Sequence, residues 1–449
     1  MLAMAMSLSA EAAATRLALP KRYVITDFGA VTNAQTVNTK AIQSAIDVCA
    51  GNGGGVVVVP RGVFMSGALF FKQGVNLLVE KGAVLKGTTN QDDYPQVFTR
   101  WEGVERTWTC AFLNFDRMTN VVVTGEGTID GSGDLWMQSS RFGRRGRRGG
   151  TNPIPAFTNA AYGGAASNIY TNVSGTNGFP RRGRPRLICF SNCRNVRITN
   201  LHLHQQAIWC LHILYCRDVV ANNLDIRAFQ YIPSSDGIDV DSSRDVKISR
   251  CYISCYDDDI SIKSGKDADG LRVNRPSENI TISDCTIGLG GGIDMGSEVS
   301  GSIRHVLVQR CKFTGTGQAA RIKSQPSRGG VIEDITWRDI QLNNTRQAVD
   351  FNLEWRMVPP IAPPARVLTV ARNLRLINFS GIAQSGGVMH GLKDSPILGV
   401  QFKNCNVAAQ RGLVLGNVQD PDLSGLHLKV GSGEAIIHSD VLEQLEEQQ

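Results

Sequence analysis

Short segments that alternate apolar and polar residues recur along most of this chain. Each opens on a polar residue, usually Asn or Asp, and they begin at Asn120, Asn195, Asp218, Asp245, Asn279, His305, Asp334 and Asn373. Most of their separations fall at roughly 23 to 39 residues, which is the range of solenoid repeats. Alternation buries one face of a strand and leaves the other in water. Because one such coil cannot bury its apolar face alone, successive coils must stack.

The repeat predicts an all-β fold, a single-stranded parallel β-helix. A βαβ fold fits less well because crossover helices are missing, and the blades of a propeller are the alternative. One amphipathic helix is predicted from Asn38 to Ala50, where Ile42, Ile46 and Cys49 recur at helical spacing. We expect this helix to cap the open N-terminal end of the solenoid, where strand edges would otherwise be unpaired.

The chain divides into a leader, a β-helix domain and a tail. Residues 1–20 begin with small apolar residues and are predicted to be the remnant of a signal sequence, which favours a secreted or periplasmic protein. Residues 21–440 are predicted to form one catalytic β-helix domain with an insertion loop at 138–185, followed by an acidic tail at 441–449. No run is long and apolar enough to span a bilayer, and a monomer is expected.

The formal charge of +7, from 47 Lys and Arg against 40 Asp and Glu, favours an acidic partner. Charge alone leaves both nucleic acid and acidic polysaccharide open. Five arginines between Arg141 and Arg148 lie within the insertion, which is read either as a solvated loop or as a basic lid over an acidic substrate.

The eleven cysteines predict buried thiols and no disulfide framework. Several follow a polar residue at one place in the repeat, as in Asn192-Cys193 and Tyr215-Cys216, so they are expected to stack inside the coils. CxxC spacing is missing, and neither a metal nor another cofactor is predicted.

Three short stretches place carboxylates and cations next to β-branched segments. They are Ser234-Ser235-Asp236-Gly237, Asp257-Asp258-Asp259-Ile260 and Arg321-Ile322-Lys323. Hydrolysis of a glycosidic bond needs one carboxylic acid and one carboxylate, and a uronic acid adds a carboxylate that Arg and Lys can hold. The plain alternative is that aspartates such as Asp239, Asp241, Asp245 and Asp259 only cap turns.

The order of several further motifs resembles glycoside hydrolase family 28, the polygalacturonases and their relatives. The matching stretches are Phe28-Gly29-Ala30, Asn38 to Gln43, Gly53-Gly54-Gly55, Pro60-Arg61-Gly62, Gly125 to Gly131 and Arg184 to Ile188. The resemblance covers nearly the whole chain. It implies a right-handed parallel β-helix and hydrolysis of galacturonate-containing pectin or its oligomers, with no nucleic acid as partner.

The resemblance also implies roles for individual residues. Asp257 matches the family's general acid, and Asp236 and Asp258 match the carboxylates that activate water, so the anomeric centre would be inverted. Arg321 and Lys323 match the pair that binds the substrate's uronate. Asp236 and Asp257 are about one coil apart, so they are expected on adjacent rungs roughly 4.8 Å apart, where each raises the pKa of the other.

Three positions depart from the family pattern. Ser234 stands where Asn is usual, Gly291 stands where the histidine of Gly-His-Gly is usual, and Asp294 replaces a small hydroxyl residue. Ordinary polygalacturonase activity is therefore in question. Rhamnogalacturonan or a substituted or oligomeric galacturonide becomes a candidate substrate, and the long insertion between Gln138 and Pro185 favours action from chain ends.

Other aromatic residues and histidines receive no catalytic assignment. His202, His204 and His212 are expected to be packed or hydrogen-bonded, although one of them could stand in for the missing histidine. Tyr231, Tyr256 and Trp355 are candidates for stacking on sugar rings.

Two other functional classes remain open at this stage. A β-helix polysaccharide lyase would use Ca²⁺ and a base, and would release unsaturated uronates. A catalytically weakened pectin-binding protein would bind without turnover.

Overall fold

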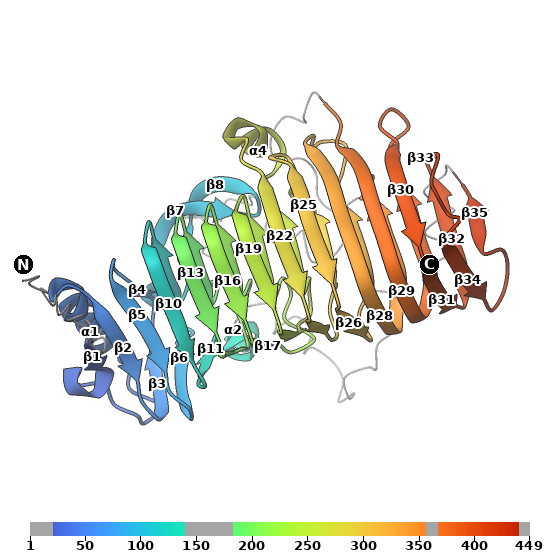
Figure 1. Cartoon of the computed structure of the whole chain (residues 1–449). Helices are drawn as coiled ribbons and strands as arrows, with labels where there is room; N and C mark the ends of the chain where they lie inside the picture. The colour runs from blue at the N-terminus through green and yellow to red at the C-terminus, as the bar shows by residue number, and fades with distance from the viewer. Residues whose placement is uncertain (1–20, 140–182, 356–366, 440–449) are drawn as a thin grey trace, which may run out of the picture.

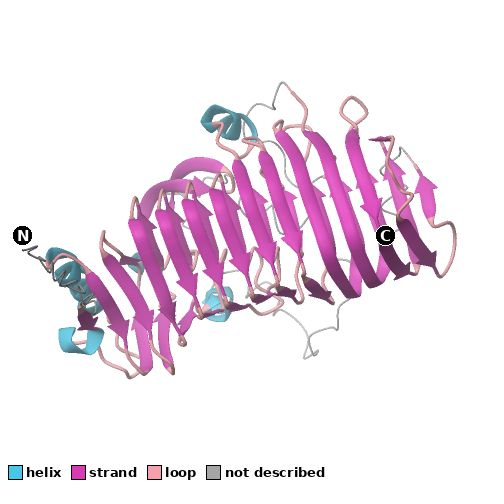
Figure 2. Ribbon diagram, in the orientation of Figure 1, coloured by secondary structure: helices cyan, strands magenta, loops and turns pink. Residues whose placement is uncertain are grey.

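The regular structure of the described residues is mostly β-strand, wound into one long parallel β-helix (Figures 1 and 2). The structure is a computed structural model and describes residues 21–139, 183–355 and 367–439. Parallel pairing links each strand to one in the next coil, which gives a 33-stranded sheet with three faces. The predicted β-helix is confirmed and the propeller is excluded.

The three faces are defined by which strands pair in register. Face 1 contains β1 (Arg22–Val24), β2 (Gly55–Val59), β5 (Val75–Val79), β10 (Thr119–Gly125), β13 (Arg194–Thr199), β16 (Arg217–Asn222), β19 (Arg244–Ser249), β22 (Ser277–Ser283), β25 (Ile303–Gln309), β30 (Ile397–Lys403) and β33 (Val418–Gln419). Face 2 contains β3 (Gly62–Ser66), β6 (Ala83–Gly87), β11 (Thr128–Asp130), β14 (His202–His204), β17 (Asp225–Arg227), β20 (Tyr252–Ser254), β23 (Thr286–Ile287), β26 (Lys312–Thr314), β31 (Cys405–Ala409) and β34 (Leu426–Val430).

Face 3 contains β4 (Leu69–Phe70), β9 (Leu113–Asp116), β12 (Ile188–Ser191), β15 (Leu211–Leu214), β18 (Ile238–Asp241), β21 (Ile260–Lys263), β24 (Ile293–Gly296), β27 (Gln318–Lys323), β32 (Arg411–Gly416) and β35 (Ile436–His438). Two long strands, β28 (Val331–Asn352) and β29 (Val370–His390), run through all three faces. An antiparallel hairpin, β7 (Gln96–Trp101) and β8 (Val104–Thr109), forms a separate two-stranded sheet.

The polar residue that opens each predicted segment lies just inside a face 1 strand and has a left-handed backbone. The φ angles at these positions lie between 53° and 61° in Asn120, Asn195, Asp218, Asp245, Asn279, His305, Asp334 and Asn373. Asn and Asp tolerate this conformation better than other side chains. Their side chains also form a ladder along the solenoid, as when the Asn195 amide donates to Asn120 at 2.6 Å.

The core of the solenoid is apolar and contains stacked thiols. All eleven cysteines are buried and unpaired, as predicted. The Cys193 amide, for example, donates to the Cys216 Sγ of the next coil at 3.4 Å. The same alternation that fills this core sends every second side chain of each strand outward.

Helix α1 (Thr39–Gly51) confirms the predicted amphipathic helix and lies at the N-terminal end of the solenoid (Figure 1). Its buried side chains are Ile42, Ala45, Ile46 and Cys49. The other helical elements are short: η1 (Ile25–Phe28), η2 (Gln91–Asp93), α2 (Gly133–Ser139) and α4 (Asp267–Val273).

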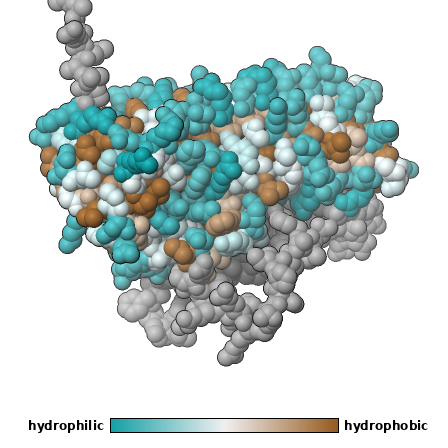
Figure 3. Space-filling model, turned by 90° about the horizontal axis from the view of Figure 1, so that it is seen from below, coloured by the Kyte–Doolittle hydropathy of each residue, from teal (hydrophilic) through white to brown (hydrophobic). Residues whose placement is uncertain are grey.

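Several predicted segments lie outside the described residues: the leader at 1–20, the arginines between Arg141 and Arg148, most of the 138–185 insertion, and the tail at 441–449. Within the described ranges, no helix combines the length and the apolar character that a membrane crossing requires. The surface seen from below is mainly polar, with apolar residues scattered among the polar ones (Figure 3).

Candidate active site

The predicted site residues lie on face 3 strands or in the turns that lead into them, within four successive coils. Asp236 comes just before β18, Asp257 and Asp258 come just before β21, and Arg321 and Lys323 lie on β27. The turns of adjacent coils are joined through their backbones, since the Gly237 amide donates to the Asp258 carbonyl at 2.9 Å. The structure therefore brings all five predicted residues into one region.

Strand register explains why these side chains meet. On face 3, Asp294 pairs with Arg321, which pairs with Asp350 on the next strand. Ile322 between Arg321 and Lys323 is fully buried in the core. Because side chains alternate along a strand, the two cations on either side of it must both point outward.

Asp258 is the carboxylate that the cations hold. Lys323 Nζ makes a short ion pair with Asp258 Oδ2, and Arg321 donates to Asp258 Oδ1 at 3.3 Å. Burial by itself would raise the pKa of Asp258, but the charges of Lys323 and Arg321 outweigh it and lower the pKa to about 2. Asp258 is therefore ionised at neutral pH.

Asp257, the residue before Asp258, has a pKa shifted in the opposite direction. Burial and the negative charge of Asp258 raise its pKa. Its Oδ1 accepts a hydrogen bond from the Asp258 backbone amide at 3.0 Å, which fixes the orientation of the carboxyl group. Asp257 is also more exposed than Asp258, which is 3% exposed. The pair thus places a carboxyl group with a raised pKa next to an ionised carboxylate.

Asp236 belongs to a second cluster around the buried Lys263. Lys263 Nζ lies 3.7 Å from Asp236, 3.5 Å from Asp239 and 3.4 Å from Glu298. Burial and the charge of Asp239 raise the pKa of Asp236 well above its ordinary value. Of the two carboxylates predicted to activate water, only Asp258 is thus held ionised by its cations, while Asp236 titrates as one of a coupled group.

Sequence reasoning missed Lys263 and Glu298 and treated Asp239 as a turn residue. The available signal was the alternation of Ile260-Ser261-Ile262-Lys263, which follows the aspartates and resembles Arg321-Ile322-Lys323. Two apolar residues at every second position send the intervening polar side chains to the same outer face as the site.

The hairpin β7–β8 covers part of this outer face and helps to bury the charged Asp241. Trp101 and Trp108 stack with ring centroids 5.3 Å apart, and Trp101 also contacts Trp209 on the solenoid at 4.6 Å. From the same hairpin, Arg100 donates to Asp241 Oδ1 at 2.8 Å. Asp241, which could have been a simple turn residue, is therefore the buried partner of Arg100.

Gly291 lies directly against the candidate acid and base. A Cβ at this position would meet Asp258 Oδ1 at 2.6 Å and Arg321 Nη1 at 3.4 Å. The Gly291 amide donates to the Asp257 carbonyl at 2.8 Å. No side chain fits at this position unless Asp258 moves away.

Asp294 is fully buried beside the same cations. Its Oδ2 lies 3.2 Å from Lys323 Nζ and accepts a hydrogen bond from Ser261 Oγ at 3.2 Å. Burial and the charge of Asp258 raise the pKa of Asp294 to about 7. This departure from the family pattern therefore adds a carboxyl group that titrates near neutral pH.

Among the three aromatic candidates, Trp355 is the one that lies against the cations of the site. Its ring lies 5.1 Å from Lys323 Nζ and 5.7 Å from the Arg321 guanidinium. Tyr231 stacks on Phe229 with centroids 5.4 Å apart, and both rings are exposed. Tyr256 lies in the turn just before Asp257 and donates its backbone amide to Ser235 Oγ at 3.2 Å.

None of the three candidate histidines bonds to Asp257. His212 is buried between Arg186 Nη1, 2.6 Å from its Nδ1, and Asp241 Oδ2, 3.5 Å from its Nε2. Burial lowers the pKa of His212 to about 4, so it is a neutral packed residue. His202 and His204 lie on face 2 with Asp225, and within the described ranges these three are the one group spaced to hold a metal ion.

Comparison with known proteins identifies relatives for most of the chain. Residues 158–420, more than half of the chain, match the model of glycosyl hydrolases family 28. A probable polygalacturonase from Vitis vinifera is 28% identical over 72% of this chain and 61% of that protein. An exo-poly-alpha-D-galacturonosidase from Dickeya chrysanthemi is 27% identical over 76% of this chain and 58% of its own length. The matched region thus spans about three-fifths of each relative.

One solved structure is similar to this chain over almost the whole length of both proteins. The hyperthermoactive exopolygalacturonase from Thermotoga maritima has a TM-score of 0.74 and 25% sequence identity, covering 93% of this chain and 94% of that one. The polygalacturonase from Erwinia carotovora ssp. carotovora has a TM-score of 0.62 at 20% identity and supports the fold alone. The expected right-handed parallel β-helix is confirmed.

Proposed function

The chain belongs to family 28 of the glycosyl hydrolases, and on this basis we propose that it hydrolyses glycosidic bonds in galacturonate-containing pectic polysaccharide or oligosaccharide. The proposed mechanism is general acid and base catalysis with inversion at the anomeric carbon. The observation that carries it is the Asp257–Asp258 turn, where one carboxyl has a raised pKa and its neighbour is held ionised by Lys323 and Arg321.

Asp257 is the proposed general acid. Its raised pKa keeps a proton available, and its partial exposure lets the glycosidic oxygen of a substrate reach it. As the bond to the leaving sugar breaks, this proton moves from the Asp257 carboxyl to the departing oxygen. Asp258 is the proposed base, because an ionised carboxylate can accept a proton from water as that water attacks the anomeric carbon.

Asp236 is proposed as the third carboxylate of the site. Its contact with Lys263 and the nearby Asp239 make it one of a group that shares protons. In this position it supports the attacking water together with Asp258. Lys263, which also lies 4.9 Å from the Trp209 ring, keeps the group from accumulating unbalanced negative charge.

Arg321 and Lys323 are proposed to bind the uronate of the substrate. The two cations also pair with Asp258, Asp294 and Asp350 inside the protein. The Arg321 side chain is 11% exposed and that of Lys323 is 5% exposed, so we assign the direct contact mainly to Arg321. Its planar guanidinium can hold a second carboxylate while it donates to the first.

The finer proposal is exo-action on a galacturonide. Exo-action is supported by two similar proteins whose names describe exo-acting enzymes. Separately, Gly291 stands where polygalacturonases usually have the histidine of Gly-His-Gly. A substituted galacturonide or rhamnogalacturonan is the specialised substrate that this departure favours. Because the substrate is an extracellular polymer, we also propose that the chain acts as a secreted or periplasmic monomer whose catalytic domain is residues 21–440.

Product analysis tests the proposal most directly. The purified chain would be incubated with polygalacturonate, its oligomers and rhamnogalacturonan, and products would be separated within the first minutes while proton NMR follows the anomer formed. We expect one dominant short uronate with inverted configuration.

Each other outcome has a distinct meaning. A ladder of products contradicts exo-action. Products that absorb as unsaturated uronates, lost on chelation, identify a lyase. Binding without turnover on the whole panel identifies a pectin-binding protein and overturns the hydrolase proposal.

A further inference from the structure

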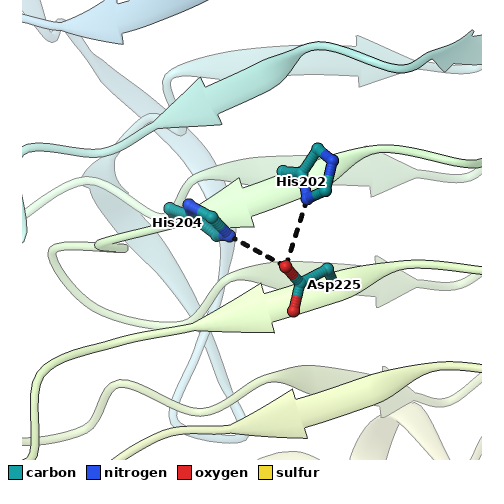
Figure 4. A group of neighbouring side chains, drawn as sticks. All are labelled: His202, His204 and Asp225. Atoms are coloured by element: carbon teal, nitrogen blue, oxygen red, sulfur yellow. Dashed lines mark hydrogen bonds and ion pairs between the residues drawn. The ribbon is translucent and has the colours of Figure 1, made fainter.

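His202, His204 and Asp225 form a cluster (Figure 4) on face 2, whereas the aspartates of the candidate active site belong to face 3. His202 and His204 are at positions i and i+2 of β14, and Asp225 is the register partner of His202 on β17. Leu203, between the histidines, is fully buried. Both imidazoles therefore leave the same side of the strand, next to a carboxylate from the following coil.

Two of the three separations between ligand atoms in the cluster match those around a shared metal ion. His202 Nδ1 lies 3.1 Å and His204 Nε2 lies 3.4 Å from the same oxygen, Asp225 Oδ2. All three atoms lie within 4.8 Å of one another. In a tetrahedral zinc site with bonds of about 2.0 to 2.2 Å, neighbouring ligand atoms are about 3.3 Å apart. Two of the three edges already have this length.

The second oxygen of Asp225 is engaged by a supporting residue. Arg227 Nε donates to Asp225 Oδ1 at 2.6 Å, and the Arg227 guanidinium lies 4.5 Å from the Tyr252 ring. This contact orients the carboxylate and leaves Oδ2 facing the histidines, as groups behind a metal ligand commonly do. On the other side, Asp130 of β11 is the register partner of His204 and adds a further carboxyl group.

We infer that His202, His204 and Asp225 bind a divalent transition-metal ion, with Zn²⁺ as the best match. Two imidazole nitrogens and one carboxylate oxygen suit zinc better than Mg²⁺ or Ca²⁺, which take oxygen ligands. The ion would connect β14 to β17 and so fasten two successive coils. It lies on a different face from Asp257 and Asp258, so its role is structural and does not depend on the proposed function.

Zinc titration of the full chain tests the inference. After treatment with EDTA and removal of the chelator, the chain is titrated with ZnCl₂ by calorimetry, and thermal unfolding is recorded with and without Zn²⁺. We expect one ion per chain and a higher unfolding temperature with zinc. His204→Ala and Asp225→Asn should each weaken binding by about tenfold or more, since even residues behind a ligand contribute this much.

A matched control is available on face 1. His305 Nδ1 lies 3.4 Å from Asp334 Oδ2, a single histidine–aspartate pair on the surface. His305→Ala should leave zinc binding unchanged. Circular dichroism of each variant shows whether it is folded. If His204→Ala does not fold, His202→Gln takes its place in the zinc titration. Absence of zinc binding by the folded parent, equal affinity for Mg²⁺, or folded site variants that bind as tightly as the parent would each overturn the inference.

Discussion

The outer sides of face 1 and face 3 carry the same kinds of residue in opposite environments. On face 1, Arg194 and Asp218 form an ion pair of 3.3 Å with side chains 64% and 38% exposed. On face 3, the pair of Lys323 and Asp258 has side chains 5% and 4% exposed. The exposed pair joins neighbouring coils, β13 and β16, whereas the buried pair joins Lys323 on β27 to the turn before β21, two coils away.

The difference lies in what covers each face. Part of face 3 is covered by the β7–β8 hairpin, where Trp101 packs against Trp209 and Arg100 pairs with the buried Asp241. Further along the same face, the Trp355 ring lies against Arg321 and Lys323. An exposed pair is worth about 0 to 1 kcal/mol, whereas breaking a buried pair leaves an uncompensated charge at a cost of about 3 to 5 kcal/mol. Exposed ion pairs such as those of face 1 would be enough to hold successive coils together. The buried charges of face 3 therefore support the proposed catalytic role of that face.

The largest expected effect is loss of the acid on face 3. Asp257→Asn keeps the shape of the side chain but cannot deliver a proton, so kcat should fall by roughly 10² to 10⁴. The comparison is Asp218→Asn on face 1, which should keep parental kcat. Both variants should unfold at similar denaturant concentrations. Parental turnover in Asp257→Asn would remove Asp257 as the acid.

Removal of one buried cation should lower stability more than any change on face 1. Lys323→Met leaves Asp258 and Asp294 without their shared partner, at an expected cost of about 3 to 5 kcal/mol in the free energy of unfolding. Urea unfolding of the variant, followed by circular dichroism, measures this. A loss below about 1 kcal/mol, the range of exposed pairs, would show that face 3 behaves like face 1.

The pH dependence of stability should differ between the two faces because of Asp294. Its folded pKa of about 7 exceeds the unfolded value of 3.8, so the folded chain binds this proton more tightly. The resulting stability is fully present below pH 3.8 and is lost as the pH rises to about 7, by up to about 4 kcal/mol.

Asp294→Asn should abolish the pH-dependent part of the unfolding free energy that arises from the raised pKa of Asp294. We therefore expect the difference in unfolding free energy between variant and parent to change across that pH window, measured by urea unfolding at several pH values. Asp218→Asn on face 1 provides the baseline. An Asp294→Asn difference that stays constant with pH would contradict a raised pKa at this residue.

Arg321→Lys tests whether the cations of face 3 contact the substrate. The change keeps the charge but loses the planar fork, so catalysis on an acidic substrate should weaken by about 1.5 to 3 kcal/mol. A carboxyl-esterified substrate should be affected much less. Measurement of kcat/KM for both substrate forms decides this, and an equal loss on both would show that Arg321 acts only through Asp258 or Asp350.

The smallest effect is expected on face 1. Arg194→Gln removes an exposed ion pair and should change the free energy of unfolding by less than about 1 kcal/mol, with an even smaller change at high salt. Urea unfolding at low and high ionic strength measures it. A loss comparable to that of Lys323→Met would mean that burial is not what separates the two faces.

Much of the fold followed from local sequence pattern. The alternation around residues such as Val196 and Ile198 identified the coils, and Asn38 to Ala50 identified the terminal helix because its apolar spacing is helical. The stacked cysteines followed because they recur at one place in the repeat. These features depend on residues close together in the chain or on a fixed repeat length.

Alternation could have placed Lys263 on the outer face, but the partners of Lys263 could not be found in this way. Lys263 and Glu298 are far apart in sequence, and their contact of 3.4 Å depends on how the coils stack. The covering hairpin was also not predicted, since nothing local to Trp101 indicates that it packs against Trp209.

Alternation and repeat length are local properties, and they predict the parallel β-helix, its capping helix, and the outward direction of Asp, Arg and Lys along face 3. Which of these charges are buried and paired depends on how the coils stack in space. The ionised state of Asp258 depends on Lys323, a residue from another coil, and on the low exposure of both. A pKa is set by the charges and the water around a group, and these are known only when the coils and the hairpin are placed in space.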